Sequence, residues 1–340
     1  MNLLILGEYP SERDMDIGAA YSDGLGKLLK ANLHRMGINP RKVQWDTVLP
    51  EYQPWSQVVG PKKFGIPNLK PVGQKYVRAH NETHVRQCWD RINRRKPNLI
   101  LALGELAMWA TTNHKNLDSA RGRVSQCHDG LLGLKCLPTY SPKTVAADYS
   151  RRPIWLMDFD KAVREVQFSD FRRPQRFIHV EPTLEEMEDF FNEYIAPCTT
   201  LSVDIEVKGY KERAHNIACV GFAPSTSRAL VVPFFDETKP DGNYWHTLRE
   251  ELQAWSFVRR VLRSGKATGG QNYQYDVQHM WRGVGIPNPD FAWDTMLMAH
   301  ALEPELEKGL GFLASVYTDE PAWKGMHKTA NVKGVKRGDD

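Results

Sequence analysis

The segment Thr200-Leu201-Ser202-Val203-Asp204-Ile205-Glu206 joins a run of β-branched and apolar residues to two acids. Its composition predicts a buried strand, and residues two apart in a strand point to the same side. We therefore expect Asp204 and Glu206 to project together, with Ile205 turned into the core. Adjacent carboxylates repel each other and lose hydration on burial. A hard divalent cation between them is the simplest compensation, although two solvated acids at a strand end would give the same pattern.

Two later segments add further polar residues to this pattern. Residues 269–276 predict a short strand, beginning near Lys266, that leads into a helix starting near Asn272. Asp276 lies four residues after Asn272, so the two side chains share one helix face. A third acidic segment follows as Trp293-Asp294-Thr295-Met296. Three separate segments thus carry acids that a fold could bring together.

In this order, Asp-x-Glu, Asn-x-x-x-Asp and Asp-Thr-Met resemble the 3′→5′ proofreading exonuclease domain of family A DNA polymerases, of the DEDD type. Residues 310–315 (Leu-Gly-Phe-Leu-Ala-Ser) and 317–324 (Tyr-Thr-Asp-Glu-Pro-Ala-Trp-Lys) are most similar to phage polymerases. The resemblance covers roughly residues 175–330. It implies a mixed sheet of the ribonuclease H-like fold and a DNA substrate.

The resemblance also implies roles for three acids. Two divalent metal ions, Mg²⁺ or Mn²⁺, roughly 3.5–4 Å apart would support hydrolysis of the 3′-terminal nucleotide. Asp204 would bridge both ions, Glu206 would hold one of them near the attacking water, and Asp276 would bind the second. The family's fourth acid belongs to a Tyr-x-x-x-Asp motif, and Tyr317-Thr318-Asp319 has the wrong spacing. We expect either a chain that stops before this acid, as part of a longer or split polymerase, or an acid that has moved.

Nucleic-acid contacts are expected beside these acids. Asn272 would orient the start of its helix or a backbone phosphate, and a plain N-cap role is an equal alternative. Tyr273 and Tyr275 are available to stack on the bases of a single-stranded 3′ end, although core positions would also explain them. The expected partners are DNA, as a single-stranded 3′ end or primer–template, and the remaining polymerase polypeptide.

The first half of the chain alternates predicted strands and helices. The strands are expected at residues 3–6, 42–49, 99–103 and 134–140, and the helices near 24–36, 82–95 and 154–166. This alternation predicts a three-layer α/β domain, with a largely parallel sheet and helices on both faces.

Short motifs in this half occur in the order seen in the uracil-DNA glycosylase superfamily, in the branch that carries an iron–sulfur cluster. They are Gly7-Glu8-x-Pro10, Gly104-Glu105-Leu106-Ala107, Arg121-Gly122 and Pro138-Thr139-Tyr140-Ser141-Pro142. The resemblance covers roughly residues 1–165. It implies a pocket for a DNA base at the carboxyl ends of the strands.

The departures from that superfamily predict a degenerate glycosylase site. Only Cys88 lies at a plausible position among the four cluster cysteines, so no iron–sulfur cluster is expected. Ser141 replaces the histidine that would donate to the uracil carbonyl, and losing such a donor costs about 100- to 1000-fold in rate. The base-reading asparagine is not evident around Trp45-Asp46-Thr47. Glu8 matches the acidic position and is placed to orient a water.

We therefore predict a glycosylase-like domain at 1–168, a linker at 169–175, an exonuclease domain at 176–330 and a polar tail at 331–340, with residues 328–340 disordered. The net charge of +4 does not by itself indicate nucleic acid, and five scattered cysteines suit a reducing cytosol. No signal peptide or membrane span is evident, so a cytoplasmic protein is expected, in the host cytoplasm if it comes from a phage. The alternatives are an inert DNA- or replisome-binding module and a uracil-DNA glycosylase.

Overall fold

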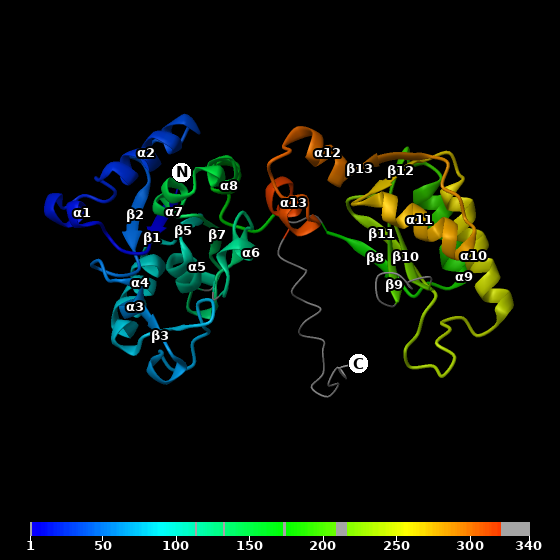
Figure 1. The fold of residues 1–340 in the computed structure, drawn as a ribbon, viewed down its shortest axis with the longest axis horizontal. Helices are drawn as coiled ribbons and strands as arrows, with labels where there is room; N and C mark the ends of the chain where they lie inside the picture. The colour runs from blue at the N-terminus through cyan, green and yellow to red at the C-terminus, as the bar shows by residue number, and fades with distance from the viewer. Residues whose placement is uncertain (1, 113, 132, 173–174, 209–215, 321–340) are drawn as a thin grey trace. The chain divides into compact units, whose positions relative to one another are not determined.

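The computed structural model describes residues 2–112, 114–131, 133–172, 175–208 and 216–320 (Figure 1). The tail at 328–340 that was expected to be disordered lies outside these residues. The chain divides into two compact units: unit 1 contains Met1–Arg172 and Gly311–Asp340, and unit 2 contains Arg173–Leu310.

Unit 1 is built on a five-stranded sheet in the order β2-β1-β5-β7-β6. The first four strands in this order pair in parallel, and the short edge strand β6 is antiparallel to β7. The bounds are β1 Leu3–Gly7, β2 Gln44–Thr47, β5 Leu99–Leu103, β6 Ser125–Gln126 and β7 Lys135–Thr139. The largely parallel sheet predicted from the sequence is confirmed.

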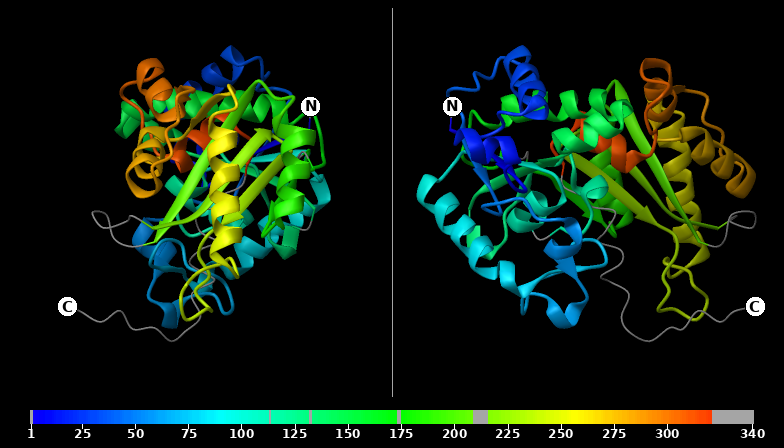
Figure 2. Two further views of the ribbon diagram at one scale, coloured as in Figure 1. Left: turned by 90° about the vertical axis from the view of Figure 1, so that its right-hand side faces the viewer. Right: turned by 60° about the vertical axis from the view of Figure 1, so that its left-hand side comes forward.

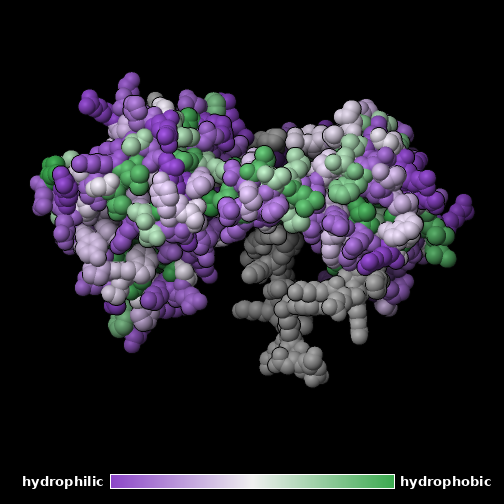
Figure 3. All heavy atoms as spheres, turned by 45° about the horizontal axis from the view of Figure 1, so that its top comes forward, coloured by the Kyte–Doolittle hydropathy of each residue, from purple (hydrophilic) through white to green (hydrophobic). Residues whose placement is uncertain are grey.

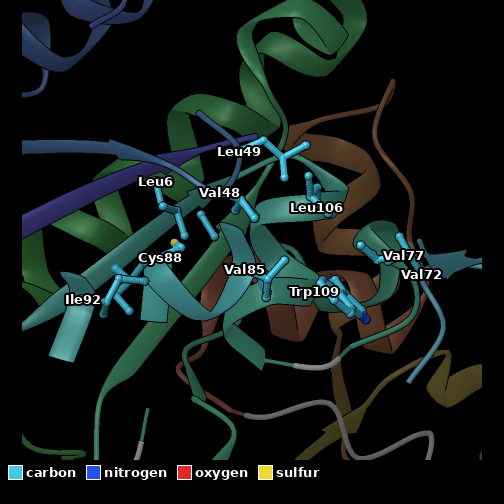
Figure 4. Packing of buried hydrophobic residues seen from close by; sticks show 14 of the residues in the cluster. Leu6, Val48, Leu49, Val72, Val77, Val85, Cys88, Ile92, Leu106 and Trp109 are labelled. Carbon is cyan, nitrogen blue, oxygen red and sulfur yellow. The ribbon is translucent and has the colours of Figure 1, made fainter. Parts of the chain in front are cut away.

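Successive residues of β1 pack into two separate hydrophobic cores. Leu4 and Leu6 belong to one hydrophobic cluster, and Leu3 and Ile5 belong to another. Figure 4 shows the first cluster, in which Cys88 packs with its neighbours beside the sheet. Because alternate residues of a strand point to opposite faces, the sheet is covered on both sides, as predicted. The helices are α1 Glu12–Ile17, α2 Gly24–Arg35, α3 Trp55–Val58, α4 Glu82–Arg95, α5 Glu105–Thr112, α6 Leu117–Ala120, α7 Pro142–Ala147 and α8 Arg152–Glu165, with a two-stranded sheet of β3 Val59–Gly60 and β4 Tyr76–Val77.

Unit 2 is built on a mixed six-stranded sheet in the order β13-β12-β9-β10-β11-β8. β10 is antiparallel to both β9 and β11, whereas β12 is parallel to β9 and to β13. The bounds are β8 Phe177–Val180, β9 Thr200–Lys208, β10 Asn216–Ser225, β11 Arg228–Pro233, β12 Ala267–Gly270 and β13 Phe291–Asp294. An antiparallel meander followed by parallel strands on the other side of β9 is the arrangement expected of a ribonuclease H-like fold.

The helices of unit 2 are α9 Leu184–Phe190, α10 Leu248–Leu262, α11 Tyr273–Val284 and α12 Thr295–Leu302. Capping boxes at Thr183 and Thr247 start α9 and α10. These two helices lie side by side on one face of the sheet (Figure 2). Helix α10 turns its Ala254-Phe257-Val258-Val261 face to the sheet and leaves Leu248 and Leu252 exposed.

Helix α13 Leu310–Tyr317 packs with unit 1, although the sequence-based ranges placed it with the exonuclease domain. Among the described residues, no helix is long and apolar enough to span a membrane. The surface seen in Figure 3 is mainly hydrophilic, with hydrophobic residues distributed between the polar ones.

Candidate active sites

The two acids of the opening segment lie within β9, which continues past them to Lys208. The predicted strand end at Glu206 was therefore two residues early. Asp204 pairs across the sheet with Gly221, and Glu206 pairs with Cys219. Ile205 is buried between them, so the two carboxylates share the opposite side of the strand, as predicted.

The side chain of Asp276 accepts a hydrogen bond from the backbone of β9. β12 pairs with β9 only as far as Ser202, so the next part of that edge of β9 is left for α11. The Ile205 N–H donates to Asp276 Oδ1 at 2.8 Å, a hydrogen bond between residues 71 positions apart. This bond fixes the Asp276 carboxyl at the strand residue that separates Asp204 from Glu206.

Asp294 has a structural role in starting two helices. Its carboxylate accepts from the backbone N–H groups of Asn272 at 3.0 Å and Tyr273 at 2.7 Å, and it also accepts from Met296 as the N-cap of α12. Asn272 sits at the N-cap position of α11 in the left-handed region, with φ of 55°, and its side chain makes no capping hydrogen bond. The capping that we expected from Asn272 is thus supplied by Asp294, which the sequence did not indicate.

The two candidate stacking residues differ in exposure. Tyr273 is 2% exposed, and its hydroxyl accepts from Asn288 Nδ2 at 2.7 Å. Its ring belongs to the core, so the stacking role suggested for Tyr273 is wrong. Tyr275 is 37% exposed, and its ring packs on His279 with centroids 3.9 Å apart. Tyr275 is therefore the more exposed of the two rings.

Burial and repulsion between neighbouring acids explain the pKa shifts of Asp276 and Asp204. Burial, together with the negative charges of Asp204 and Glu206, raises the pKa of Asp276 to about 7. Burial and the charge of Glu206 also raise the pKa of Asp204. A divalent cation would relieve this repulsion, so the donor set fits a hard metal ion. Within the described part of the chain, however, no group of three or more His, Cys, Asp or Glu side chains is positioned so that it could hold a metal ion.

The second candidate site is a pocket of about 400 Å³ in unit 1, at the carboxyl ends of β1, β5 and β7. Glu8 lines it, and its Oε1 accepts from the Leu106 N–H at 3.0 Å, at the start of α5. Burial raises the pKa of Glu8 to about 7. A β-carbon at Gly104, where φ is 98°, would lie 2.7 Å from the Glu8 carboxyl, so glycine permits this contact. Tyr21 also lines the pocket and was missed, since no motif marks it.

The other glycosylase motifs have structural partners. Ser141 lines the pocket, but its hydroxyl caps α7 by accepting from the Thr144 N–H at 3.2 Å. Asp46, near the expected base-reading position, forms ion pairs with Arg91 at 3.0 Å and Arg95 at 2.7 Å. These partners hold Ser141 and Asp46 in place for structural reasons, while Glu8 is half-buried in the wall of the pocket.

Residues 1–167 match the family model described as the uracil DNA glycosylase superfamily. No curated protein matches the sequence. Solved structures similar to the chain include the Aedes aegypti Nibbler EXO domain, with 10% identity, a TM-score of 0.36 and coverage of 49% of this chain and 80% of that chain. Brucella melitensis NrnC with bound Mg²⁺ has 15% identity, a TM-score of 0.30 and coverage of 44% and 64%. Escherichia coli RNase D, an exoribonuclease, has 12% identity, a TM-score of 0.26 and coverage of 40% and 36%. The chain thus spans less than two thirds of the latter two proteins.

Proposed function

We propose that unit 2 is a metal-dependent 3′→5′ exonuclease module that removes nucleotides from the 3′ end of single-stranded DNA. The observation that carries the proposal is the bond from Ile205 N–H to Asp276, because it sets a third carboxyl between the strand positions of Asp204 and Glu206. Repulsion among three acids at one strand is relieved by cations, and DNA hydrolysis is a reaction that such cations support.

The chain's own groups have distinct tasks in this proposal. Asp204 and Glu206 would hold the metal ions from the exposed side of β9. Asp276 has one oxygen occupied by the Ile205 N–H, so its other oxygen is the one that can serve as a ligand. When bound, divalent ions would supply water activation and charge neutralisation at the leaving 3′ oxygen. The exposed ring of Tyr275 would stack on a base of the substrate.

A nuclease assay on the full chain tests this function. The protein is incubated with 5′-labelled single-stranded DNA in Mg²⁺, in Mn²⁺ and with chelator, beside Asp204→Asn. Asp189→Asn, an exposed acid on α9, is the matched control. We expect products shortened from the 3′ end that disappear with chelator and with Asp204→Asn and persist with Asp189→Asn. Absence of products in both metals would reject the exonuclease and favour the inert binding module.

The resemblance of residues 310–324 to phage sequences supports a narrower proposal, that this module is the proofreading part of a family A DNA polymerase. Proofreading requires preference for an unpaired 3′ end. We expect faster removal of a mismatched primer terminus than of a paired one on the same template. Equal rates on the two termini would contradict the proofreading role and leave a general exonuclease.

The pocket of unit 1 favours uracil-DNA glycosylase as a second candidate function, because it buries a carboxyl at the strand ends. This candidate predicts abasic sites in uracil-containing DNA without any added metal. Glu8→Ala should abolish them, and an unchanged rate would reject the idea. The position of Ser141 disfavours this candidate, since its hydroxyl lies within hydrogen-bond distance of both the N–H and the hydroxyl of Thr144 and replaces a longer histidine donor.

A further inference from the structure

The helix that follows the exonuclease unit returns to the glycosylase-like unit. The chain leaves unit 1 after Arg172 and rejoins it at Gly311, the second residue of α13. Four consecutive residues of α13, from Leu313 to Val316, are at most 8% exposed. Figure 1 draws α13 beside α6 and α8 of unit 1. A surface of unit 1 is therefore covered by a segment almost 140 residues further along the chain.

Lys161 of α8 binds the carboxyl end of α13. Its ammonium donates to Ser315 O at 2.6 Å, to Thr318 O at 2.6 Å and to Gly122 O at 2.8 Å. The last carbonyls of a helix have no partner within the helix and carry a partial negative charge, so a cation is favourable there. Lys161 is 1% exposed, and all three of its donor positions have acceptors.

Two arginines bind the other side of the helix. Arg121 donates to Ser315 Oγ at 2.8 Å and lies over the Phe312 ring, 5.2 Å from its centroid. Arg121 is itself 2% exposed and pairs with Asp158 at 3.4 Å. Arg123 donates to the carbonyl of Gly311. Contacts from α8 and from the 121–123 loop thus converge on one helix.

Gly122 permits this close approach. Its φ is 68°, and a β-carbon there would lie 3.0 Å from Ser315 O and 2.5 Å from Asp158 Oδ1. Because Ser315 O is a backbone atom, it can move away only if α13 moves. The Arg121-Gly122 pair, which belongs to the glycosylase-like motifs, therefore forms part of the surface that binds α13 in this chain.

We propose that Arg121, Gly122, Arg123 and Lys161 form an α13 cradle, through which the glycosylase-like unit clamps the chain leaving the exonuclease unit. The partner is helix α13 of the same chain, recognised by the carbonyls of Gly311, Ser315 and Thr318 and by the Ser315 hydroxyl. The exonuclease unit is then an insertion whose two ends are both attached to unit 1. The inference does not depend on either proposed activity, because it rests on these contacts alone.

Hydrogen exchange on the full chain tests the cradle. Lys161→Met keeps the length of the side chain but removes the donor to Ser315 and Thr318. Lys135→Met is the matched control, since Lys135 is also fully buried in unit 1 but pairs with Glu165. Hydrogen bonds to charged groups are worth about 1.5–3 kcal/mol, so we expect exchange of the amides at 311–318 to rise about 10- to 100-fold in Lys161→Met only. Equal exchange in the two variants would overturn the proposal.

A glycine pair gives an independent test that keeps Lys161. Gly122→Ala places a methyl group against the backbone of α13, whereas Gly37→Ala, at φ of 79°, meets nothing within 4 Å. Both carry the cost of a left-handed alanine, so the two variants differ in what the added methyl group meets, which at Gly122 is the backbone of α13 and the Asp158 carboxyl. We expect faster exchange at 311–318 in Gly122→Ala and wild-type exchange there in Gly37→Ala. The same rate in both would contradict the cradle.

Cutting the linker tests whether the α13 cradle can hold the two fragments of the chain together. A protease site inserted after Arg172 in the full chain allows one cut between the two units. If the cradle holds α13, the two fragments elute together from a size-exclusion column, and Lys161→Met separates them. Separation of the wild-type fragments, or co-elution that Lys161→Met does not change, would overturn the proposal.

Discussion

Glu8 in unit 1 and Asp276 in unit 2 are two carboxyls with the same pKa and different surroundings. Each accepts one backbone N–H, from Leu106 at 3.0 Å and from Ile205 at 2.8 Å respectively. Burial is the largest cause of the shift for both, and both pKa values rise to about 7. Neither the pKa nor the local hydrogen bond distinguishes them.

The neighbouring charges distinguish the two carboxyls. Glu105 raises the pKa of Glu8 while Lys143 lowers it, so charges of both signs surround that group. The charges that act on Asp276 are those of Asp204 and Glu206, and both raise its pKa. Protonation stabilises an isolated buried acid, whereas the repulsion among three neighbouring acids would also be relieved by the divalent cation proposed for unit 2. The source of a pKa shift, more than its size, thus distinguishes an isolated acid from one that lies beside other acids.

Replacing Asp276 should have the largest effect on activity. Asp276→Asn can still accept from the Ile205 N–H but loses the charge that would hold a metal ion. Removing a preorganised electrostatic group at a reacting centre costs about 100- to 1000-fold, and we expect that loss in single-turnover cleavage of single-stranded DNA. If Asp276→Asn cleaved DNA at the wild-type rate, the charge of Asp276 would not be needed for cleavage, and Asp276 would not differ in this respect from Glu8.

Metal binding should stabilise one unit and leave the other unchanged. At a Mn²⁺ concentration 100 times the Kd, binding adds about 2.7 kcal/mol to the stability of the state that binds. We expect slower hydrogen exchange in β9 and no change in β1, measured in one sample of the full chain. Asp204→Asn should abolish the protection of β9. Equal protection of both strands would show that the cation does not act through the three acids.

A methyl group added beside Glu8 should lower the free energy of unfolding of unit 1, whether or not a metal ion is present. Gly104→Ala combines a φ of 98° with a contact of 2.7 Å to the Glu8 carboxyl, whereas Gly18→Ala, at φ of 67°, meets nothing within 4 Å. Strained positions of this kind cost about 1–3 kcal/mol each, so Gly104→Ala should lower the free energy of unfolding of unit 1 by more than Gly18→Ala. Urea denaturation of both variants measures this difference. Equal losses would mean that Glu8 moves aside freely.

The strands that form both sheets could be predicted because their patterns are local. Alternation along β9 set Asp204 and Glu206 on one side and Ile205 on the other. Strand and helix alternation likewise predicted the parallel sheet of unit 1. In each case the residues that decide the structure are neighbours in the sequence.

Contacts between residues far apart in the sequence could not be predicted, because the spacing of residues within one element does not determine which other element it contacts. The Ile205–Asp276 bond appears only when β12 ends early and leaves an edge of β9 open. Asp294 caps α11 although it lies 22 residues after Asn272. The sequence alone therefore indicated Asn272 as the cap. Tyr273 and Tyr275 look alike in sequence, yet the turn of α11 buries one ring and exposes the other. Periodicity gives the face of an element, while its partner depends on how the sheet is assembled.

Titration of Glu8 should give the smallest effect. Its pKa in the folded protein is about 7, above its ordinary value of 4.5, so the folded state holds the proton more tightly than the unfolded state. The free energy of unfolding of unit 1 should therefore fall as the pH rises from about 4.5 through about 7. Glu8→Gln keeps an acceptor for the Leu106 N–H but has no proton to lose. Urea denaturation at pH 5 and pH 8 should show a shallower decline in Glu8→Gln than in the wild type. Identical declines would mean that Glu8 does not carry this pH dependence, and the similarity between Glu8 and Asp276 would then fail at its starting point, the shared pKa.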